Sequence, residues 1–226
     1  MCPPTTSCSE RPASEPAQLG RLIVLEGMPG AGKSTAIAAL SVHGQVTIGE
    51  YTTGSGVTIP PGCHPAPADE QSHQGNWLTK HHLTTAARAP GGPVICDRDW
   101  ISSLAFAASL DDGGALLRER AAWARAHLEH GQLACADVYV VLHIDAPTSL
   151  TRRAGRLTPA HPWSTLAGLE HLIDFYTDPP HAVHAYEPAL AEQLSTCTWA
   201  HLHAPDRATI LDQLRTHTSH SERLTR

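Results

Sequence analysis

Lysine is scarce in this chain of 226 residues, whose 16 basic residues comprise two lysines, Lys33 and Lys80, and fourteen arginines. The net charge of −6 gives no basic excess that would bind nucleic acid polymers or an anionic membrane surface. No apolar stretch approaches the ~18 residues of a membrane-spanning helix. The N-terminus also lacks the apolar segment of a secretory signal. We therefore expect a cytoplasmic protein that binds neither nucleic acid nor membranes.

Metal-binding cysteine patterns are absent as well. None of the six cysteines forms a C-x-x-C pair, and Cys96 and Cys135 lie in or beside apolar runs, where a thiol packs as a small hydrophobe. The sixteen histidines include neighbours at Cys63-His64, His73 and His81-His82, but no H-E-x-x-H motif frames them. We expect reduced thiols and surface histidines rather than zinc ligands.

A phosphate-binding motif follows the first apolar run of the chain. Leu22 to Leu25 is continuous and branched, as in strands buried on both faces of a parallel sheet. The next residues match G-x-x-x-x-G-K-[ST], and a helix to about Ser41 follows. The expected nucleotide-binding residues are Gly27, Met28, Pro29, Gly30, Ala31, Gly32, Lys33, Ser34 and Thr35. The strand before and the helix after favour a functional loop over a chance match in a glycine-rich segment.

The chemistry of this loop points to a nucleoside triphosphate. Glycines let the backbone curl so that its N–H groups face phosphate oxygens, and the following helix adds its N-terminal partial positive charge. Lys33 is expected between the β- and γ-phosphates, and the Ser34 hydroxyl is expected to ligate Mg²⁺. ATP and Mg²⁺ are therefore the expected cofactors.

Strands alternate with helices along the rest of the chain, which is typical of a three-layer α/β domain with a parallel sheet. Further strands are expected over 46–48, 94–96, 138–145 and 199–203. Helices are expected over 76–89, with Asn76 near the cap, and over 101–110, 115–129, 166–176, 184–194 and 207–216, and another begins near Pro147.

The domain is expected to span residues 19–217. Residues 1–18 are rich in Pro, Ser and Thr and predict a disordered lead-in, and 218–226 predict a flexible tail. Gly and Pro dominate 52–74, and a connection of this length inside a domain is usually functional or mobile.

Acidic residues end several of the expected strands, at the sheet edge where α/β domains bind ligands. Asp97 can hold Mg²⁺ directly or through water, and Arg98 can clamp phosphoryl oxygens. The alternative for this pair is a helix-capping aspartate with a surface arginine. Glu50 ends the second strand and can orient or deprotonate an attacking hydroxyl. The alternative for Glu50 is a solvated turn residue.

Arg152, Arg153 and Arg156 precede a proline-containing loop over 157–165. Arg152 and Arg156 are four apart and are expected to share a helix face. Such a cluster can neutralise a transferring phosphoryl group from a lid that closes over the site. The alternative is a solvated basic helix, and we expect one of the three arginines to have no role.

Several segments in order resemble the P-loop nucleotide and nucleoside kinase group. LEGMPGAGKST is similar to the start of thymidylate kinases, and VICDRDWISSLAFAASL resembles their DR-[YF] stretch and the ERS segment of deoxynucleoside kinases. VYVVLHIDAPTSLTRRAGR resembles their strand and lid, LEHLIDFYTD the helix after the lid, and WAHLHAPDRATILDQL the last strand and helix.

This resemblance implies a five-stranded parallel sheet with a short lid, and transfer of the ATP γ-phosphoryl group to a nucleoside or nucleoside monophosphate. Lys33 and Ser34 would hold the triphosphate and metal, Asp97 the metal, Arg98 the acceptor or transferred phosphate, and Arg152 and Arg156 the lid position. Glu50 matches the base of deoxynucleoside kinases. The family often forms homodimers.

The acceptor stays open at this point. Thymidylate kinases carry an acidic residue in the phosphate loop where this chain has Pro29, so a nucleoside, another nucleoside-like molecule or a non-nucleoside small alcohol are alternatives. A P-loop module that binds nucleotide for regulation and transfers nothing is a further alternative. A signalling GTPase is disfavoured, because the D-x-x-G at 111–114 follows a helix and no Asn-Lys-x-Asp exists.

Overall fold

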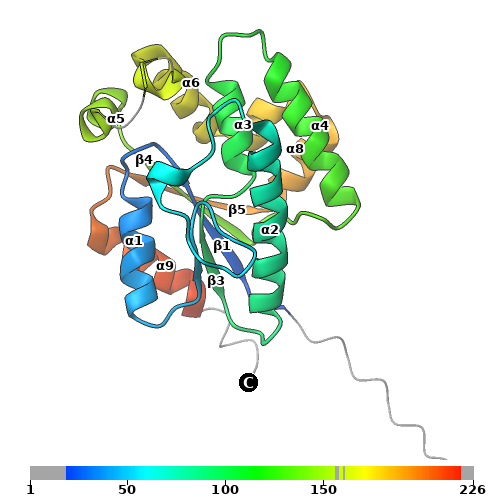
Figure 1. Cartoon of the computed structure of the whole chain (residues 1–226), viewed down its shortest axis with the longest axis vertical. Helices are drawn as coiled ribbons and strands as arrows, with labels where there is room; N and C mark the ends of the chain where they lie inside the picture. The colour runs from blue at the N-terminus through cyan, green and yellow to red at the C-terminus, as the bar shows by residue number, and fades with distance from the viewer. Residues whose placement is uncertain (1–18, 156–157, 160, 220–226) are drawn as a thin grey trace, which may run out of the picture.

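The computed structural model describes residues 19–155, 158–159 and 161–219 (Figure 1). The strands are β1 (Leu22–Gly27), β2 (Thr47–Ile48), β3 (Val94–Asp97), β4 (Val138–His143) and β5 (Thr198–His203). The α-helices are α1 (Lys33–Val42), α2 (Glu70–Arg88), α3 (Ile101–Ala108), α4 (Ala115–Glu129), α5 (Ala146–Arg153), α6 (Leu166–Thr177), α7 (Pro179–His184), α8 (Pro188–Ser195) and α9 (Arg207–Ser219). Short 3₁₀ turns are η1 (Pro61–Cys63) and η2 (Pro162–Ser164).

The strands form a five-stranded parallel sheet in the order β2-β3-β1-β4-β5. β1 lies at the centre, where Leu25 pairs with Asp97 of β3 and with Val140 of β4. Every residue of β1, β3 and β4 is buried, which explains why these strands are near-continuous apolar runs. The predicted three-layer α/β fold and its five parallel strands are confirmed.

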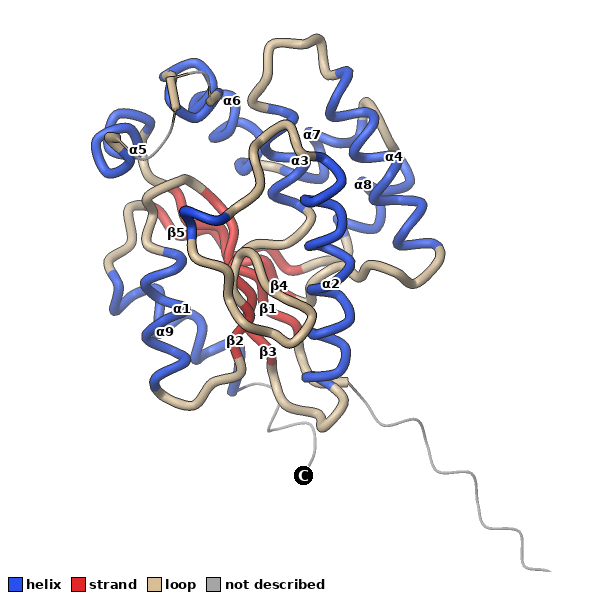
Figure 2. Tube along the Cα trace, viewed as in Figure 1, coloured by secondary structure: helices blue, strands red, loops and turns tan. Residues whose placement is uncertain are grey.

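Helices cover both faces of the sheet. Figures 1 and 2 show α1 and α9 on one face, and α2, α3, α4 and α8 on the other. Helix α6 contributes Leu169, Leu172 and Tyr176 to the core, where all three are fully buried, whereas Leu166 at its first position is 50% exposed. Because all strands run in parallel, their carboxyl ends meet at one edge, where Gly27, Glu50 and Asp97 come together.

Two helix boundaries differ from the sequence predictions. The helix expected from Asn76 begins at Glu70, with the Asp69 carboxylate capping the Ser72 N–H at 3.1 Å, and Asn76 is buried inside it. The polar residues 70–75 carry no apolar period, which hid this first part of the helix. The helix expected over 184–194 begins later, at Pro188, and a separate short helix, α7, precedes it, because Pro179 and Pro188 each suit the first turn of a helix.

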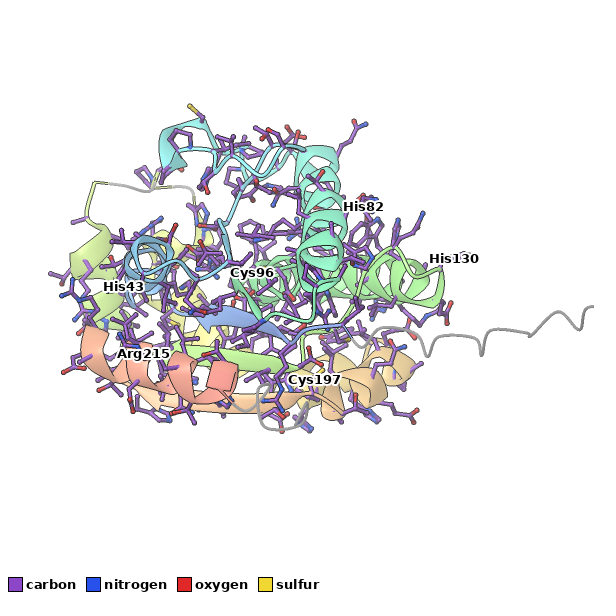
Figure 3. All side chains as sticks on the ribbon, turned by 90° about the horizontal axis from the view of Figure 1, so that it is seen from below. His43, His82, Cys96, His130, Cys197 and Arg215 are labelled. Carbon is purple, nitrogen blue, oxygen red and sulfur yellow. The ribbon has the colours of Figure 1, made fainter. Side chains whose placement is uncertain are left out.

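The two chain ends, for which disorder was predicted, lie largely outside the described residues, and so do Cys2 and Cys8. Residues 1–18 and 220–226 are among those not described, so the disordered lead-in and the flexible tail stay predictions, while α9 continues to Ser219. The described thiols, which form no disulfide with one another, are Cys63, Cys96, Cys135 and Cys197. Figure 3 shows Cys96 within the sheet and His43, His82 and His130 at the periphery, where these three histidines are exposed.

Among the described helices, none combines the length and apolarity needed to cross a bilayer. The cytoplasmic location and the homodimer stay predictions.

The first testable prediction concerns the contact between the end of β1 and β4. A Cβ at Gly27, where φ is +111°, would lie 2.3 Å from the Leu142 carbonyl oxygen, whereas at Gly44, where φ is +79°, no atom of the described residues would lie within 4 Å of it. Gly44→Ala should therefore lower the free energy of unfolding by about 1–2 kcal/mol, the cost of a positive φ. Gly27→Ala adds overpacking, for a loss of about 2–5 kcal/mol. Urea denaturation of both variants measures this difference, and equal losses would contradict the close contact.

Candidate active site

The phosphate loop forms a curled connection between β1 and α1. Gly27, Gly30 and Gly32 have φ values of +111°, +76° and +101°, which L-residues with side chains rarely adopt. Gly32 is the N-cap of α1, and no side chain among residues 19–155, 158–159 and 161–219 caps this helix end. The first N–H groups of α1 are therefore available to an anion, as the motif predicted.

Lys33 lies within the curve of this loop. Its ammonium donates to the carbonyl oxygens of Gly27 and Met28, both at 2.8 Å, and the residue is buried. The pKa of Lys33 is lowered to about 7. Burial is the larger cause, and the nearby Arg98 guanidinium is the second. A bound anion would offset both effects, because it favours the protonated ammonium.

Ser34 and Asp97 form a pair where α1 meets the end of β3. The Ser34 hydroxyl donates to Asp97 Oδ2 at 2.6 Å, while the buried Oδ1 has no hydrogen-bond partner among the described residues. Burial and the neighbouring Glu50 carboxylate raise the pKa of Asp97. Asp97 does not cap a helix, since the residue that caps α3 is Trp100, so the alternative of a capping aspartate is wrong.

Arg98 connects several acidic and hydroxyl groups. Its Nη1 donates to Ser102 Oγ at 2.9 Å and to Glu26 Oε2 at 3.3 Å, and its Nε lies 3.3 Å from Glu50 Oε1. Burial alone would lower the pKa of Arg98, but its neighbours, including Tyr176 and the two glutamates, raise it overall. Since Arg98 is 4% exposed, the alternative of a surface arginine is also wrong.

Glu26 is a site residue that the sequence analysis missed. Its carboxylate is fully buried and accepts hydrogen bonds from Ser102 Oγ at 2.7 Å, Tyr176 Oη at 2.7 Å and the Asp99 N–H at 3.0 Å. The sequence carried a signal for it, because an acidic residue inside an otherwise apolar buried strand requires a partner. That partner is Arg98.

Glu50 follows β2 and faces Arg98 across the edge of the sheet. Its side chain is 31% exposed, so one side is reachable from outside the protein. Burial raises the pKa of Glu50, but Arg98, Lys33 and His64 lower it by more, and the net shift is downward. Glu50 is therefore ionised at neutral pH and partly accessible. Its ion pair with Arg98 distinguishes it from a glutamate in a solvated turn, which would have no such partner.

A cavity of about 720 Å³ opens beside these groups. It is lined by Pro29, Ser34, Glu50, Tyr51, Pro61, Gly62, His64, Pro65, Pro67, His73, Trp77, Arg98, Ser102, Ser103, Phe106, Arg120, Arg153, Thr158, His161 and Trp163. The segment between β2 and α2, cyan in Figure 1, supplies one wall. This places part of the long 52–74 connection at the site.

Aromatic and imidazole rings form both walls of this cavity. On one side, the Tyr51 ring lies 4.3 Å from His64 and 5.8 Å from Trp77. The Tyr51 hydroxyl also bonds His73 Nδ1. His64 and His73 are partly buried and line this cavity. Sequence reasoning missed them because glycine and proline hide the structure of this connection.

The opposite wall comes from α3 and the segment after α5. Phe106, His161 and Trp163 pack with ring centroids 5.1–5.9 Å apart. The Arg98 guanidinium lies 5.4 Å from the Trp163 ring. Burial and the nearby Arg153 lower the pKa of His161 to about 4, so this imidazole is neutral at pH 7.

The predicted arginine cluster is divided by the end of α5. Arg152 Nη1 donates to the Gly30 carbonyl at 3.2 Å beside the phosphate loop, and Arg153 lines the cavity. Helix α5 ends at Arg153, and Gly155 has a φ of +72°, so the chain does not continue as a helix to 156. The prediction that Arg152 and Arg156 share a helix face is therefore wrong, and Arg156 itself lies outside the described residues.

Within the described residues, no three or more His, Cys, Asp or Glu side chains are placed to hold a metal ion by themselves. A cation at Ser34 and Asp97 would need further ligands from a bound anion or water.

At the level of sequence, no protein-family model matches this chain and no curated protein matches it. Solved structures match its fold. Deoxyadenosine kinase from M. mycoides with bound dATP gives a TM-score of 0.54 at 15% identity, over 87% of this chain and 98% of that one. Thymidylate kinase from Candida albicans gives 0.51 at 13% identity, over 90% and 93%.

The fold is that of the P-loop nucleoside and nucleotide kinases. The resemblance to this kinase group that the sequence motifs indicated is confirmed for the fold. The sequence identities of 15% and 13% are too low to transfer any property of these kinases beyond the fold.

The lowered pKa of Lys33 predicts that triphosphate binding depends on pH. Because phosphates favour the protonated ammonium, ATP affinity should fall by up to about tenfold per pH unit between pH 7.5 and 9, above the lowered pKa. Binding in this range should also take up a proton. Calorimetric titration in buffers of different ionisation enthalpy measures both effects. Lys33→Arg, which stays charged, should show a flat profile, and equal slopes in the two proteins would refute the assignment.

Proposed function

We propose that this protein transfers the γ-phosphoryl group of ATP to a hydroxyl group of a nucleoside or nucleoside-like molecule. The observation that carries this proposal is the meeting of three features at one sheet edge. These are an uncapped helix end holding a buried ammonium, the Ser34–Asp97 pair, and a ring-walled cavity into which the ionised Glu50 faces.

The phosphate loop would hold the triphosphate, with residues 27–35 supplying N–H groups and Lys33 a positive charge. Ser34 and Asp97 suit Mg²⁺, because their oxygens are hard ligands and one buried Asp97 oxygen has no hydrogen-bond partner in the described part of the chain. When bound, Mg²⁺ would neutralise charge on the phosphates. Arg152, whose Nη1 donates to the Gly30 carbonyl at 3.2 Å, would contact the same phosphate oxygens, and we extend this role to Arg156 as a prediction.

Glu50 would accept the proton of the attacking hydroxyl. Its lowered pKa keeps it ionised at neutral pH, and its exposed side opens to the cavity. Arg98 holds this carboxylate at 3.3 Å and would also stabilise charge on the transferring phosphoryl group. The aromatic walls suit a planar base, since rings pack on rings with favourable geometry.

The charges in the cavity favour a hydroxyl acceptor over a nucleoside monophosphate. Arg98 is paired with Glu26 and Glu50, and Arg120 is paired with Glu70 and donates to the Ser103 carbonyl at 2.8 Å. A second phosphate at Arg98 or Arg120 would have to compete with these carboxylates for the guanidinium group. A non-nucleoside alcohol remains a second candidate, because Glu50 would serve any hydroxyl of suitable position.

The test is release of ADP from ATP and Mg²⁺ with a panel of nucleosides, nucleoside monophosphates and sugar alcohols. We expect turnover that depends on a nucleoside, and its loss in Lys33→Ala, which should keep its fold by circular dichroism. ATP binding with no acceptor-dependent turnover across the panel would favour the regulatory alternative. Turnover with sugar alcohols alone would favour the second candidate.

Glu50→Gln tests the role of the carboxylate. Glutamine keeps the size of the side chain and can still accept a hydrogen bond from Arg98, but it cannot take a proton. We expect kcat to fall by about 10²–10⁴-fold, as on removal of a general base. Nucleotide affinity should change little. Glu119→Gln, at an exposed position of α4, is the matched control and should keep full activity. Equal kcat values for Glu50→Gln and the unmodified protein would remove Glu50 from the mechanism.

A further inference from the structure

Lys80 is the second lysine of the chain, and the proposed reaction does not use it. It lies on α2 with 3% of its surface exposed. Its ammonium donates to three carbonyl oxygens, those of Gly49 at 2.8 Å, Asp97 at 2.7 Å and Arg98 at 2.6 Å. The carbonyl of Glu50 lies farther away, at 3.4 Å.

The three short hydrogen bonds of the Lys80 ammonium limit the roles that this residue can have. An ammonium has three N–H donors, and the three short contacts use all of them. Lys80 therefore has no donor left for a phosphate or a substrate. Burying an ammonium is costly unless it is hydrogen-bonded, and an apolar side chain would fill the space without that cost. The specific gain from a lysine here is the fixing of these three carbonyl groups.

These carbonyl groups belong to the two segments that carry the reacting side chains. Gly49 directly precedes Glu50, and Asp97 and Arg98 are themselves site residues. β2 is two residues long, and its pairing with β3 ends at Ile48 and Cys96. The ladder therefore stops before Glu50, and Lys80 continues the connection between the two strand ends beyond it.

The backbone at Arg98 has a second reason to need support. Arg98 has a φ of +62°, a backbone conformation that is unfavourable for a residue with a side chain. Its N–H donates to the Leu25 carbonyl at 3.0 Å, and its own carbonyl accepts from Lys80. Both peptide groups around this strained residue are thus held, which fixes the direction of the guanidinium.

Asn76, one helical turn before Lys80, extends the same contact surface of α2. Its side-chain amide donates to the Glu50 carbonyl at 3.0 Å and accepts from the Thr52 N–H at 3.1 Å. Helix α2 therefore holds the backbone on both sides of Glu50, through two buried polar side chains.

We propose that Lys80 is a positioning residue that holds the backbone beside Glu50 against that of Asp97 and Arg98. It thereby fixes the distance between the Glu50 carboxylate, the proposed proton acceptor, and the side chains of Asp97 and Arg98, which would bind the phosphoryl group and its metal. Its effect on catalysis rests on the proposed function. Its effect on the backbone does not.

The first test measures the backbone without reference to activity. Lys80→Met keeps the length of the side chain and removes the ammonium. Thr84→Val is the matched control, because Thr84 is buried on the same helix and its hydroxyl donates to the His81 carbonyl within α2. In hydrogen–deuterium exchange, peptides covering 49–53 and 97–100 should exchange on the order of tenfold faster in Lys80→Met. Peptides from β4 should not change, and Thr84→Val should match the unmodified protein.

Unchanged exchange at both strand ends in folded Lys80→Met would overturn the proposal. If Lys80→Met does not fold, Lys80→Gln replaces it, because its amide offers two N–H donors in place of three. Exchange at the strand ends of Lys80→Gln should then be faster than in Thr84→Val, and equal rates would overturn the proposal in the same way.

The second test separates positioning from general instability by kinetics. Lys80→Met should lower kcat by about 10²-fold, the effect of misplacing reacting groups by about 1 Å. The KM for ATP should stay within about threefold, because the phosphate loop is not among the contacts of Lys80. Lys80→Gln should recover part of kcat. A parallel loss of ATP affinity and kcat would contradict positioning. If the unmodified protein transfers no phosphoryl group, the proposed function fails, and the exchange experiment alone still decides the role of Lys80.

Discussion

The site depends on the ion pairs that the buried guanidinium of Arg98 forms with Glu26 and Glu50. This guanidinium joins Glu26 in the central strand to Glu50 beyond the edge strand, and it lies against Trp163 from the segment after α5. A buried ion pair costs desolvation energy that only good geometry and further hydrogen bonds offset. Ser102 and Tyr176 supply those bonds to Glu26, and removal of Glu26 or Arg98 alone would leave a charge uncompensated in the interior.

The two ends of the site are built in different ways. The phosphate-loop end is local in sequence, because Gly27, Lys33 and Ser34 come from one loop and the first turn of one helix. The cavity end is assembled from distant segments, with Tyr51 and Trp77 on one wall and Phe106 and Trp163 on the other. The geometry of the loop is encoded in a short motif, whereas the cavity exists only after the helices have packed.

This difference explains how much could be predicted from the sequence. The apolar strands and the phosphate loop were recognisable, because period and spacing are local properties, and Glu50, Asp97 and Arg98 were expected at strand ends and lie there.

The partners of those residues were not predicted. Glu26 lay within the motif that was read, yet its contact with Arg98 spans 72 positions of the chain. Lys80 was noticed for its rarity alone. Its three carbonyl acceptors have no signature in the sequence, because every residue carries a carbonyl group.

The short edge strand β2 has a consequence for how such a protein can diverge. The segment that follows it is anchored to the rest of the domain by few ladder bonds and forms one wall of the cavity. Insertions there extend outward from the margin of the sheet and leave its central strands in register. Selection can therefore change the shape of this cavity while the central strands and the phosphate loop are inherited without change.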